Sequence, residues 1–262
     1  DRCEYGSKKI PRRIDADMER VVFNEEDIRH LSELYDAGIR QMDTELGRLF
    51  AVIEQEGRAE STLIVVTSDH GEEFMEHGRV DHFLTMYEES LRVPLILRGP
   101  GIPAGERFDQ PVSLIDIAPT LLALADLPIP AGIEGVDLSE LWRGGSGFAW
   151  SERLLFGEAS GGHEHAHWMP GVYPIYRSVR EGRYKLVEKV LASMVTYELF
   201  DLQTDPGEQV DRFEAEPEIS ARLMAHLKER GEPSSGLAGY EAVEVELDPA
   251  DREELRALGY VP

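Results

Sequence analysis

The sequence predicts an α/β fold, in which a mixed sheet flanked by helices is followed by a small antiparallel sheet with helices. Three observations predict it. A long amphipathic helical pattern leads directly into a short apolar, β-branched run at residues 62–68. A second apolar run follows at residues 93–97, as expected where helices and strands alternate. Beyond residue 145 the pattern changes to several short strand-like segments closed by turn residues.

The first element is a predicted helix over residues 25–55. Asn24 is its expected N-cap and Gly57 its expected stop. Apolar residues recur along it at steps of three and four, so we expect this face to pack in the core. They are Ile28, Leu31, Tyr35, Ile39, Met42, Leu46, Leu49 and Ile53.

Two strands and a helix follow. The run at 62–68 is apolar and bounded by polar residues, which predicts a strand buried on both faces in a helix–strand unit of a parallel sheet. The run at 93–97 predicts a second strand, and Pro94 places its start or an edge there. Residues 114–127 predict a helix that starts near Ser113.

The second half reads as a separate small α+β part. Glycines at 144–147 indicate a linker, so we expect one part over residues 1–145 and another over 146–262. Strands are expected at 154–157, 176–179, 184–187 and 197–202, with a hairpin turn at 181–182. Helices are expected at about 218–230 and 250–258.

Composition limits the partners. The chain has 262 residues and carries 51 acidic against 27 basic residues, a formal net charge of -24. Such a charge repels nucleic acid and anionic membrane surfaces, and it favours solubility. No run of roughly 18 apolar residues exists, so no membrane span is expected. Cys3 is the single cysteine, which rules out an intrachain disulfide.

The strongest chemical signal stands directly after the first strand, where residues 68–72 read Ser-Asp-His-Gly-Glu. Ligands bind at the carboxyl ends of strands in open α/β sheets. The Asp69 carboxylate and the His70 imidazole suit a divalent cation, and Gly71 would let the chain bend so that both reach it. A structural turn or helix cap is an equally good reading of the triplet alone.

Between residues 69 and 82 lie three histidines and five acids. A polar loop of this kind between two strands is typical of an active site at a sheet edge. A surface loop with a chance excess of polar residues remains the alternative.

Longer strings carry a resemblance to a known family. Residues 68–78 read Ser-Asp-His-Gly-Glu-Glu-Phe-Met-Glu-His-Gly, and residues 87–96 read Tyr-Glu-Glu-Ser-Leu-Arg-Val-Pro-Leu-Ile. Together with segments at 113–122, 135–138, 177–185 and 197–208, in this order, they closely resemble the sulfatase family of the alkaline-phosphatase superfamily. The resemblance covers roughly residues 30–260. It implies an alkaline-phosphatase-like sheet in residues 1–145 and the family's small C-terminal subdomain in 146–262.

The resemblance also implies roles. Asp69 and His70 match the family's ligands of a single divalent cation, usually calcium. His82 falls where the family often has a lysine that contacts the sulfate and the leaving-group oxygen, so it is the candidate catalytic and substrate-binding residue. A loop histidine without a role is the alternative for His82.

The family's nucleophile is a formylglycine made within a Cys/Ser-x-Pro/Ala-x-Arg motif, and no such motif occurs in these 262 residues. We therefore expect a C-terminal fragment of a longer enzyme that is inactive alone. Family members are often exported, which favours a periplasmic or secreted location and leaves a cytoplasmic one open.

Two further sets of residues have competing readings. His163 and His165 alternate in a His-Glu-His-Ala-His run and could bind a transition metal or substrate beside the active site, or lie in a flexible loop. Four basic residues could contact an anionic substrate, although salt bridges on the strands are the better account. They are Arg177, Arg180, Arg183 and Lys185.

The expected function is hydrolysis of a small or carbohydrate sulfate ester. A phosphodiesterase or phosphonate monoester hydrolase of the same superfamily is the nearest alternative, and a non-catalytic binding module with the sulfatase fold is an alternative of another class. The sequence does not fix the oligomeric state.

Overall fold

The computed structural model describes residues 4–5, 8–9, 23–82, 85–144, 149–160, 175–191 and 194–231. The chain divides into two compact units, residues 1–231 and 232–262, and all described residues lie in the first. The expected boundary at 145, the histidine run at 163–167 and the helix at 250–258 fall outside the described residues and stay predictions.

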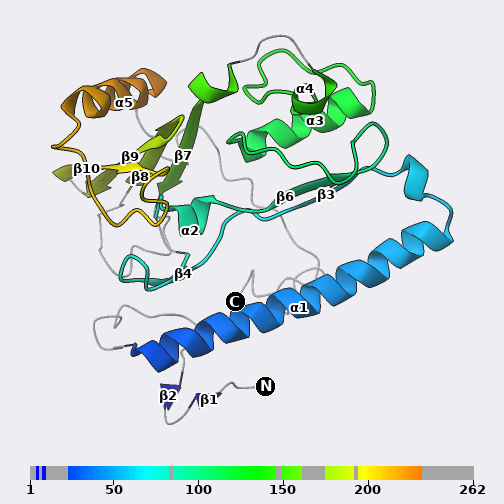
Figure 1. The fold of residues 1–262 in the computed structure, drawn as a ribbon, viewed down its shortest axis with the longest axis horizontal. Coiled ribbons are helices and arrows are strands. Elements are labelled where there is room, and N and C mark those ends of the chain that lie inside the picture. Colours follow the sequence, from blue (N-terminus) through cyan, green and yellow to red (C-terminus); the bar gives the residue numbers. More distant parts are fainter. Residues whose placement is uncertain are drawn as a thin grey trace, which may run out of the picture. The chain divides into compact units, whose positions relative to one another are not determined.

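The predicted long helix is confirmed as α1 (Glu25–Gln55; Figure 1). Asn24 caps it through a reciprocal pair: its side chain accepts hydrogen bonds from the backbone of Glu26 and Asp27 at 2.9 and 3.0 Å, and its own N–H donates to Asp27 at 3.1 Å. These bonds satisfy backbone donors that a helix start otherwise leaves open. Gly57 follows the helix with a φ of 67°, which a glycine adopts without strain.

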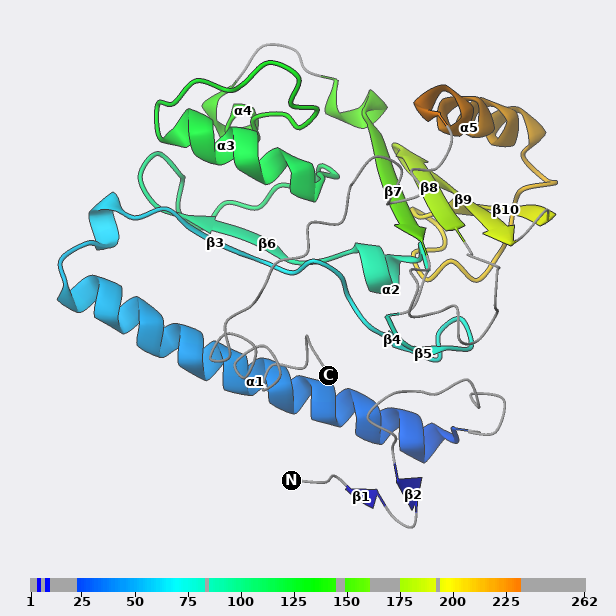
Figure 2. The same cartoon turned by 180° about the vertical axis from the view of Figure 1, so that it is seen from behind.

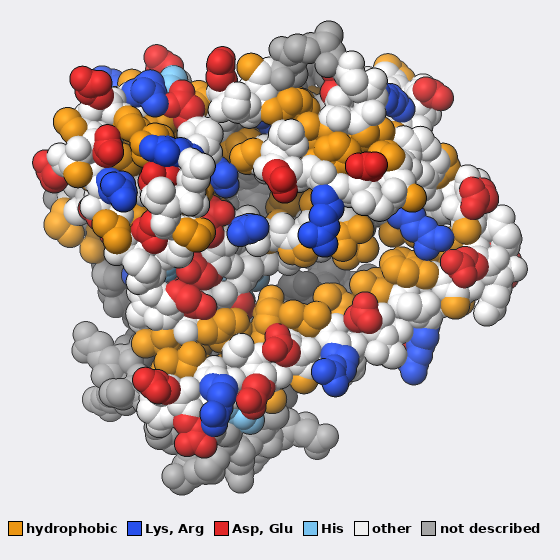
Figure 3. Space-filling model, in the orientation of Figure 1, with side chains coloured by type: hydrophobic (Ala, Val, Ile, Leu, Met, Phe, Trp, Pro, Cys, Tyr) orange, Lys and Arg blue, Asp and Glu red, His pale blue; other side chains and the backbone are white. Residues whose placement is uncertain are grey.

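The expected burial of the apolar face of α1 is wrong. Met42 and Leu49 are 55% and 54% exposed, and apolar side chains gather along this helix in Figure 3. One aromatic side chain of this face, Tyr35, contacts Phe74, with 5.4 Å between ring centroids. Amphipathic spacing fixes which face is apolar, and the described residues supply little to cover it.

Strand β3 (Ile64–Thr67) follows α1 and the 3₁₀ turn η2 (Ala59–Ser61), and it pairs with β6 (Leu95–Arg98). The pairing is antiparallel, with Val65 opposite Leu97, so the expected parallel helix–strand unit is wrong for this pair. Strand β3 is not buried on both faces either: among the described residues its sheet has two strands, Ile64, Val65 and Val66 are only partly buried, and Thr67 is exposed. Pro94 immediately precedes β6, as its missing N–H favours.

Between these strands the predicted polar loop contains structure of its own. A short antiparallel hairpin joins β4 (Glu73–Phe74) and β5 (Val80–Asp81), and helix α2 (Glu88–Leu91) follows. Figure 2 shows β4, β5 and α2 on the chain that runs from β3 back to β6.

The predicted helix at 114–127 is observed as a 3₁₀ turn, η3 (Leu114–Asp116), continued by α3 (Ile117–Leu124). Asp116, at the start of α3, is fully buried. Its carboxylate accepts hydrogen bonds from Ser113 N–H at 2.8 Å and from both terminal nitrogens of the Arg153 guanidinium at 2.6 Å. Its role is therefore structural. Helix α4 (Glu140–Arg143) and the turn η4 (Trp150–Glu152) lead to the second half.

The second half forms an antiparallel sheet in the order β10-β9-β8-β7, covered by α5 (Figure 1). All four predicted strands and the helix near 218–230 are confirmed, most with longer bounds; β10 starts three residues earlier and ends one residue earlier than predicted. They are β7 (Leu154–Ser160), β8 (Ile175–Glu181), β9 (Tyr184–Leu191), β10 (Met194–Asp201) and α5 (Pro217–Arg230). The hairpin turn is also confirmed, since Glu181 pairs with Tyr184 across Gly182, whose φ is 56°.

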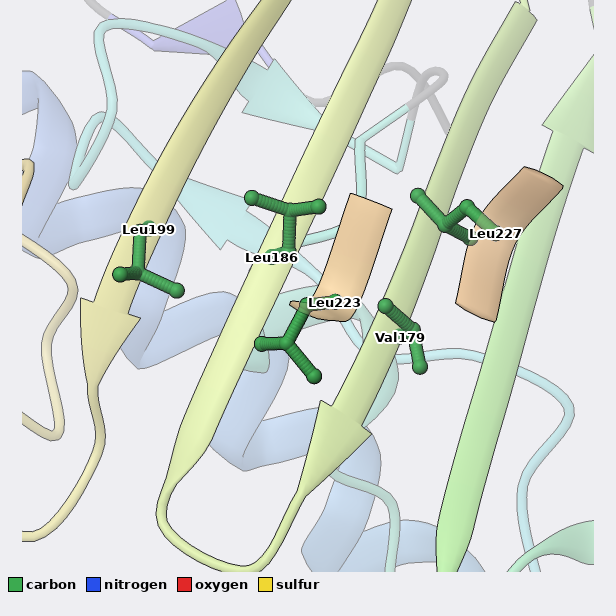
Figure 4. Close-up of a cluster of buried hydrophobic side chains, with 5 residues drawn as sticks. All are labelled: Val179, Leu186, Leu199, Leu223 and Leu227. Carbon is green, nitrogen blue, oxygen red and sulfur yellow. The ribbon is translucent and has the colours of Figure 1, made fainter. Parts of the chain in front are cut away.

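The core of this half lies between the sheet and α5 (Figure 4). Val179, Leu186 and Leu199 point from three neighbouring strands toward Leu223 and Leu227 of the helix, and all five are at most 2% exposed. Within the described part of the chain no helix is both long and apolar enough to cross a membrane. Two short strands, β1 (Glu4–Tyr5) and β2 (Lys8–Lys9), pair near the N-terminus.

Candidate active site

The segment after β3 is anchored to α2 by its backbone. Gly71 N–H donates to Ser90 C=O at 2.8 Å, and Glu72 N–H donates to Glu89 C=O at 3.0 Å. A Cβ at Gly71 would lie 1.9 Å from the Glu89 carbonyl oxygen, so only glycine fits. The sequence indicated Gly71 as a bend; its physical requirement is this close approach of two backbones.

Asp69 and His70 stand side by side at this strand end. Asp69 Oδ2 lies 3.7 Å from His70 Nε2, and the Asp69 side chain is 85% exposed. A hydrogen bond from its own backbone, then the charge of His70 and the His70 N–H, hold the pKa of Asp69 below its ordinary value. The carboxylate is therefore anionic at neutral pH and accessible to a cation.

His82 joins them from the far side of the hairpin. Its ring stacks on His70 with 4.1 Å between centroids and 20° between planes, and its Nδ1 lies 3.2 Å from Glu72 Oε2. The structure thus brings His82 to Asp69 and His70, although His82 follows His70 by 12 positions in the sequence. It adds Glu72, which the sequence reasoning missed; its place directly after Asp-His-Gly was the available signal.

The donor set suits a divalent cation only in part. A carboxylate oxygen and an imidazole nitrogen are suitable ligands, but calcium takes about six to eight oxygens. Among the described residues, no group of three or more His, Cys, Asp or Glu side chains is placed to hold a metal ion. The described part therefore supplies at most part of a metal site.

His77, the third histidine of this loop, lies inside the protein. Its ring stacks on Tyr87 with 3.6 Å between centroids, and its Nε2 lies 3.1 Å from the Glu208 carbonyl oxygen. Its Nδ1 lies 3.6 Å from Glu89, and its side chain is only 11% exposed. His77 therefore connects the hairpin to the segment that follows β10, a structural role that the sequence did not predict.

The predicted strand salt bridges are confirmed for the buried members of the basic cluster. Arg177 pairs with Glu188 at 2.5 Å, and Lys185 contacts Glu88 at 2.9 Å and Glu208 at 2.6 Å. These cations stabilise the second half and its contact with α2. His163 and His165 lie outside the described residues.

Comparison with known proteins agrees with this arrangement. The family model for Sulfatase matches residues 8–127, and the one for N-sulphoglucosamine sulphohydrolase, C-terminal, matches residues 75–232. Arylsulfatase K of Bos taurus is 32% identical over 212 residues, which are 79% of this chain and 37% of that protein. The chain thus spans little more than a third of the length of this curated relative.

Solved structures share the fold. A protein solved in complex with its substrate, D-glucosamine-2-N,6-O-disulfate, matches with a TM-score of 0.63 and 29% identity, over 73% of this chain and 38% of that one. A phosphonate monoester hydrolase from Silicibacter pomeroyi matches with a TM-score of 0.66 and 26% identity, over 86% and 46%. The model for the C-terminal part of N-sulphoglucosamine sulphohydrolase matches more than half of the chain, and the Sulfatase model matches the preceding part. The chain therefore belongs to the sulfatase family of the alkaline-phosphatase superfamily.

Proposed function

We propose that the protein hydrolyses sulfate esters, and that Asp69, His70 and His82 form part of its active site. The observation that carries the proposal is the stacking of His82 on His70 beside an anionic, exposed Asp69. Membership of the sulfatase family and the similarity to arylsulfatase K support this reaction. The substrate class we propose is a small or carbohydrate sulfate ester, supported by the sulfated glucosamine bound in a solved neighbour.

Asp69 and His70 would contribute ligands to a divalent cation, which we propose to be calcium. When bound, such an ion would supply positive charge to the sulfate oxygens. The adjacent side chains offer one hard anionic oxygen and one nitrogen, with 3.7 Å between Oδ2 and Nε2. Further ligands would have to come from outside the described residues.

His82 would assist departure of the alcohol. Its Nδ1 lies 3.2 Å from Glu72 Oε2, a contact that orients the imidazole, and an imidazole can act as a general acid toward the leaving-group oxygen. The nucleophile we propose is the family's formylglycine, for which these residues contain no motif. His163 and His165 are further proposed contacts to the substrate.

The test uses the full-length protein that contains this chain. Purified enzyme should turn over an aryl sulfate, and His82→Ala should lower kcat by roughly 10²- to 10⁴-fold, the usual loss of a general acid–base group. His226→Ala is the matched control, because His226 lies on α5 with its own acidic neighbour, Glu229 at 3.7 Å. Equal activity of the His82 and His226 variants would overturn the assignment.

A phosphonate monoester or phosphodiester is the second candidate substrate, supported by the similarity to the Silicibacter pomeroyi hydrolase. Parallel assays with an aryl sulfate, an aryl phosphonate monoester and a bis-aryl phosphate would separate the two. A kcat/KM for either phosphorus substrate above that for the sulfate would favour the second candidate. No turnover of any of them would favour a binding module.

A further inference from the structure

A groove lies at the end of the four-stranded sheet where β7 begins and β10 ends. Its volume is about 590 Å³, and its walls are residues 109–111, residues 149–151, the β8–β9 turn and the residues after β10. A Cβ at Gly182 would lie 3.3 Å from the Ser151 carbonyl oxygen, which shows how closely the turn approaches the segment before β7. Asp69, His70, Glu72 and His82 are not among its lining residues, so the groove does not contain the part of the proposed active site that the structure describes.

Two guanidinium groups line the groove. Arg183 has a half-exposed side chain whose Nη1 donates to Gln203 at 3.2 Å. Its Nη2 donates to the Tyr184 hydroxyl at 2.6 Å and lies 3.5 Å from Asp201, and the guanidinium lies 4.7 Å from the centre of the Tyr184 ring. Arg180 donates through Nε to the Gly182 carbonyl at 3.0 Å and lies 3.8 Å from Glu88. Each guanidinium has five N–H donors, and these contacts use only some of them. Both can therefore also bind an anionic oxygen.

The remaining lining residues favour a sugar over a bare anion. Trp150 supplies an indole, against which the Arg153 guanidinium lies at 6.0 Å from the ring centroid. Ser151, Gln203 and Asp109 supply a hydroxyl, an amide and a carboxylate, which can bind sugar hydroxyl groups. Aromatic surface, polar groups and planar cations together match a ring that carries both C–H faces and a negative group.

The charge of the whole protein limits the length of the ligand. With a net charge of -24, a long polyanion meets repulsion beyond the groove. At physiological salt this repulsion is screened beyond about 8 Å, so a short anion can still reach two arginines. We propose that the groove binds a short anionic oligosaccharide that carries sulfate or carboxylate, at a site separate from the described part of the proposed active site.

The experiment is calorimetric titration of the full-length protein carrying Asp69→Ala and His82→Ala, so that these residues of the proposed active site do not contribute. The probes are a sulfated disaccharide, an unsulfated disaccharide containing a uronic acid, a neutral disaccharide and inorganic sulfate. We expect binding of at least one anionic disaccharide, and the comparison of the first two identifies the anionic group. The neutral sugar and inorganic sulfate should bind at least about tenfold more weakly, since each lacks half of the contacts.

Arg183→Gln should weaken binding about tenfold or more, the loss of one charge-assisted contact. Arg98→Gln is the matched control: Arg98 is similarly exposed and pairs with Glu54 at 3.4 Å, but it lies on β6. Trp150→Leu gives a second variant that leaves the charge unchanged and should also weaken binding. Each variant is compared at equal thermal stability.

Absence of binding by every probe would overturn the proposal. So would equal losses in the Arg183 and Arg98 variants, which indicate a general charge effect, or inorganic sulfate that binds as tightly as the sugars. Because turnover is not measured and Asp69 and His82 of the proposed active site are replaced, failure here leaves the proposed hydrolysis untouched.

Discussion

The two halves of the described chain have similar apolar patterns, but the apolar side chains are buried in one half and exposed in the other. In the β7–β10 sheet, Leu199 is fully buried against α5, whereas on α1 Leu49 is 54% exposed. Both sit in regular elements with correct periodicity. The difference teaches that spacing specifies an apolar face, while burial depends on whether another element covers it. The second half therefore holds its own core, and α1 is maintained largely by local interactions.

The substitution with the largest expected effect removes an ionic contact between the two halves. Lys185→Met removes the cation that pairs with Glu88 of α2 and with Glu208, leaving two carboxylates without it. We expect a loss of roughly 3–5 kcal/mol in the free energy of unfolding at pH 8, measured by urea denaturation. Lys189→Met removes a pair with Glu198 whose side chains are 27% and 28% exposed, more than those of the Lys185 pair, and it should cost less than about 1 kcal/mol.

This loss should shrink at acidic pH. Burial raises the pKa of Glu208, and Lys185 opposes that rise. A carboxyl whose folded pKa is raised contributes stability below its unfolded pKa and loses it as pH rises through the folded pKa. Without Lys185 the pKa of Glu208 rises further, so the variant is penalised more at pH 8 than at pH 5. A penalty independent of pH would contradict the assigned role of the pair.

The second prediction tests the contrast in burial directly. Leu199→Ala should lower the free energy of unfolding by roughly 2–5 kcal/mol, because it opens a cavity between sheet and helix. Leu49→Ala, the same chemical change on α1, should alter it by less than about 0.5 kcal/mol. Similar losses in both would mean that the face of α1 is covered in solution.

The third prediction concerns the local support of α1. Asn24→Ala deletes both bonds that the cap accepts, which should cost about 1 kcal/mol of helix stability. Amide hydrogen exchange in the first turns of α1 should become roughly fivefold faster. Thr44→Ala, which removes a mid-helix bond to the Arg40 carbonyl, is the control and should leave those first turns unchanged. Unchanged exchange in the Asn24 variant would mean that packing, rather than the cap, holds the helix.

The smallest effect is a pH slope. Burial raises the pKa of Glu73, which accepts a hydrogen bond from Thr85, so its ionisation weakens the folded state as pH rises. Relative to the native chain, Glu73→Gln should therefore become more stable from pH 5 to pH 8, by a fraction of the full carboxylate desolvation cost. The exposed Glu60→Gln gives the reference slope. Parallel curves for the two variants would show that Glu73 stays neutral or is fully compensated.

Much of the fold could be predicted from the sequence because its signals are local. The period of α1, the cap at Asn24, the turn at Gly182 and the apolar strands all follow from neighbouring residues. The direction of the β3–β6 pair did not follow, because it depends on the path of the chain between residues 68 and 94. The hairpin β4–β5 was missed since its strands have two residues each and little apolar content.

The candidate site shows the same limit. Asp69 and His70 are adjacent in the chain, so their proximity needs no tertiary structure. The partners Glu72 and His82 are ten positions apart, and only the intervening hairpin brings them to 3.2 Å. The different fates of His77 and His82 depend on Tyr87 and Glu208, which no local pattern connects.

The backbone contact at Gly71 leaves no freedom in how far the tip of β3 stands from α2. A carbonyl oxygen occupies the space where a side chain would begin, so even a single methyl group would push these two segments apart. His70 precedes Gly71 directly, so this shift would also disturb the stacking of His70 on His82. Gly71 thus fixes the spacing at one edge of the proposed active site, and a substitution there would change that spacing without altering any charged group.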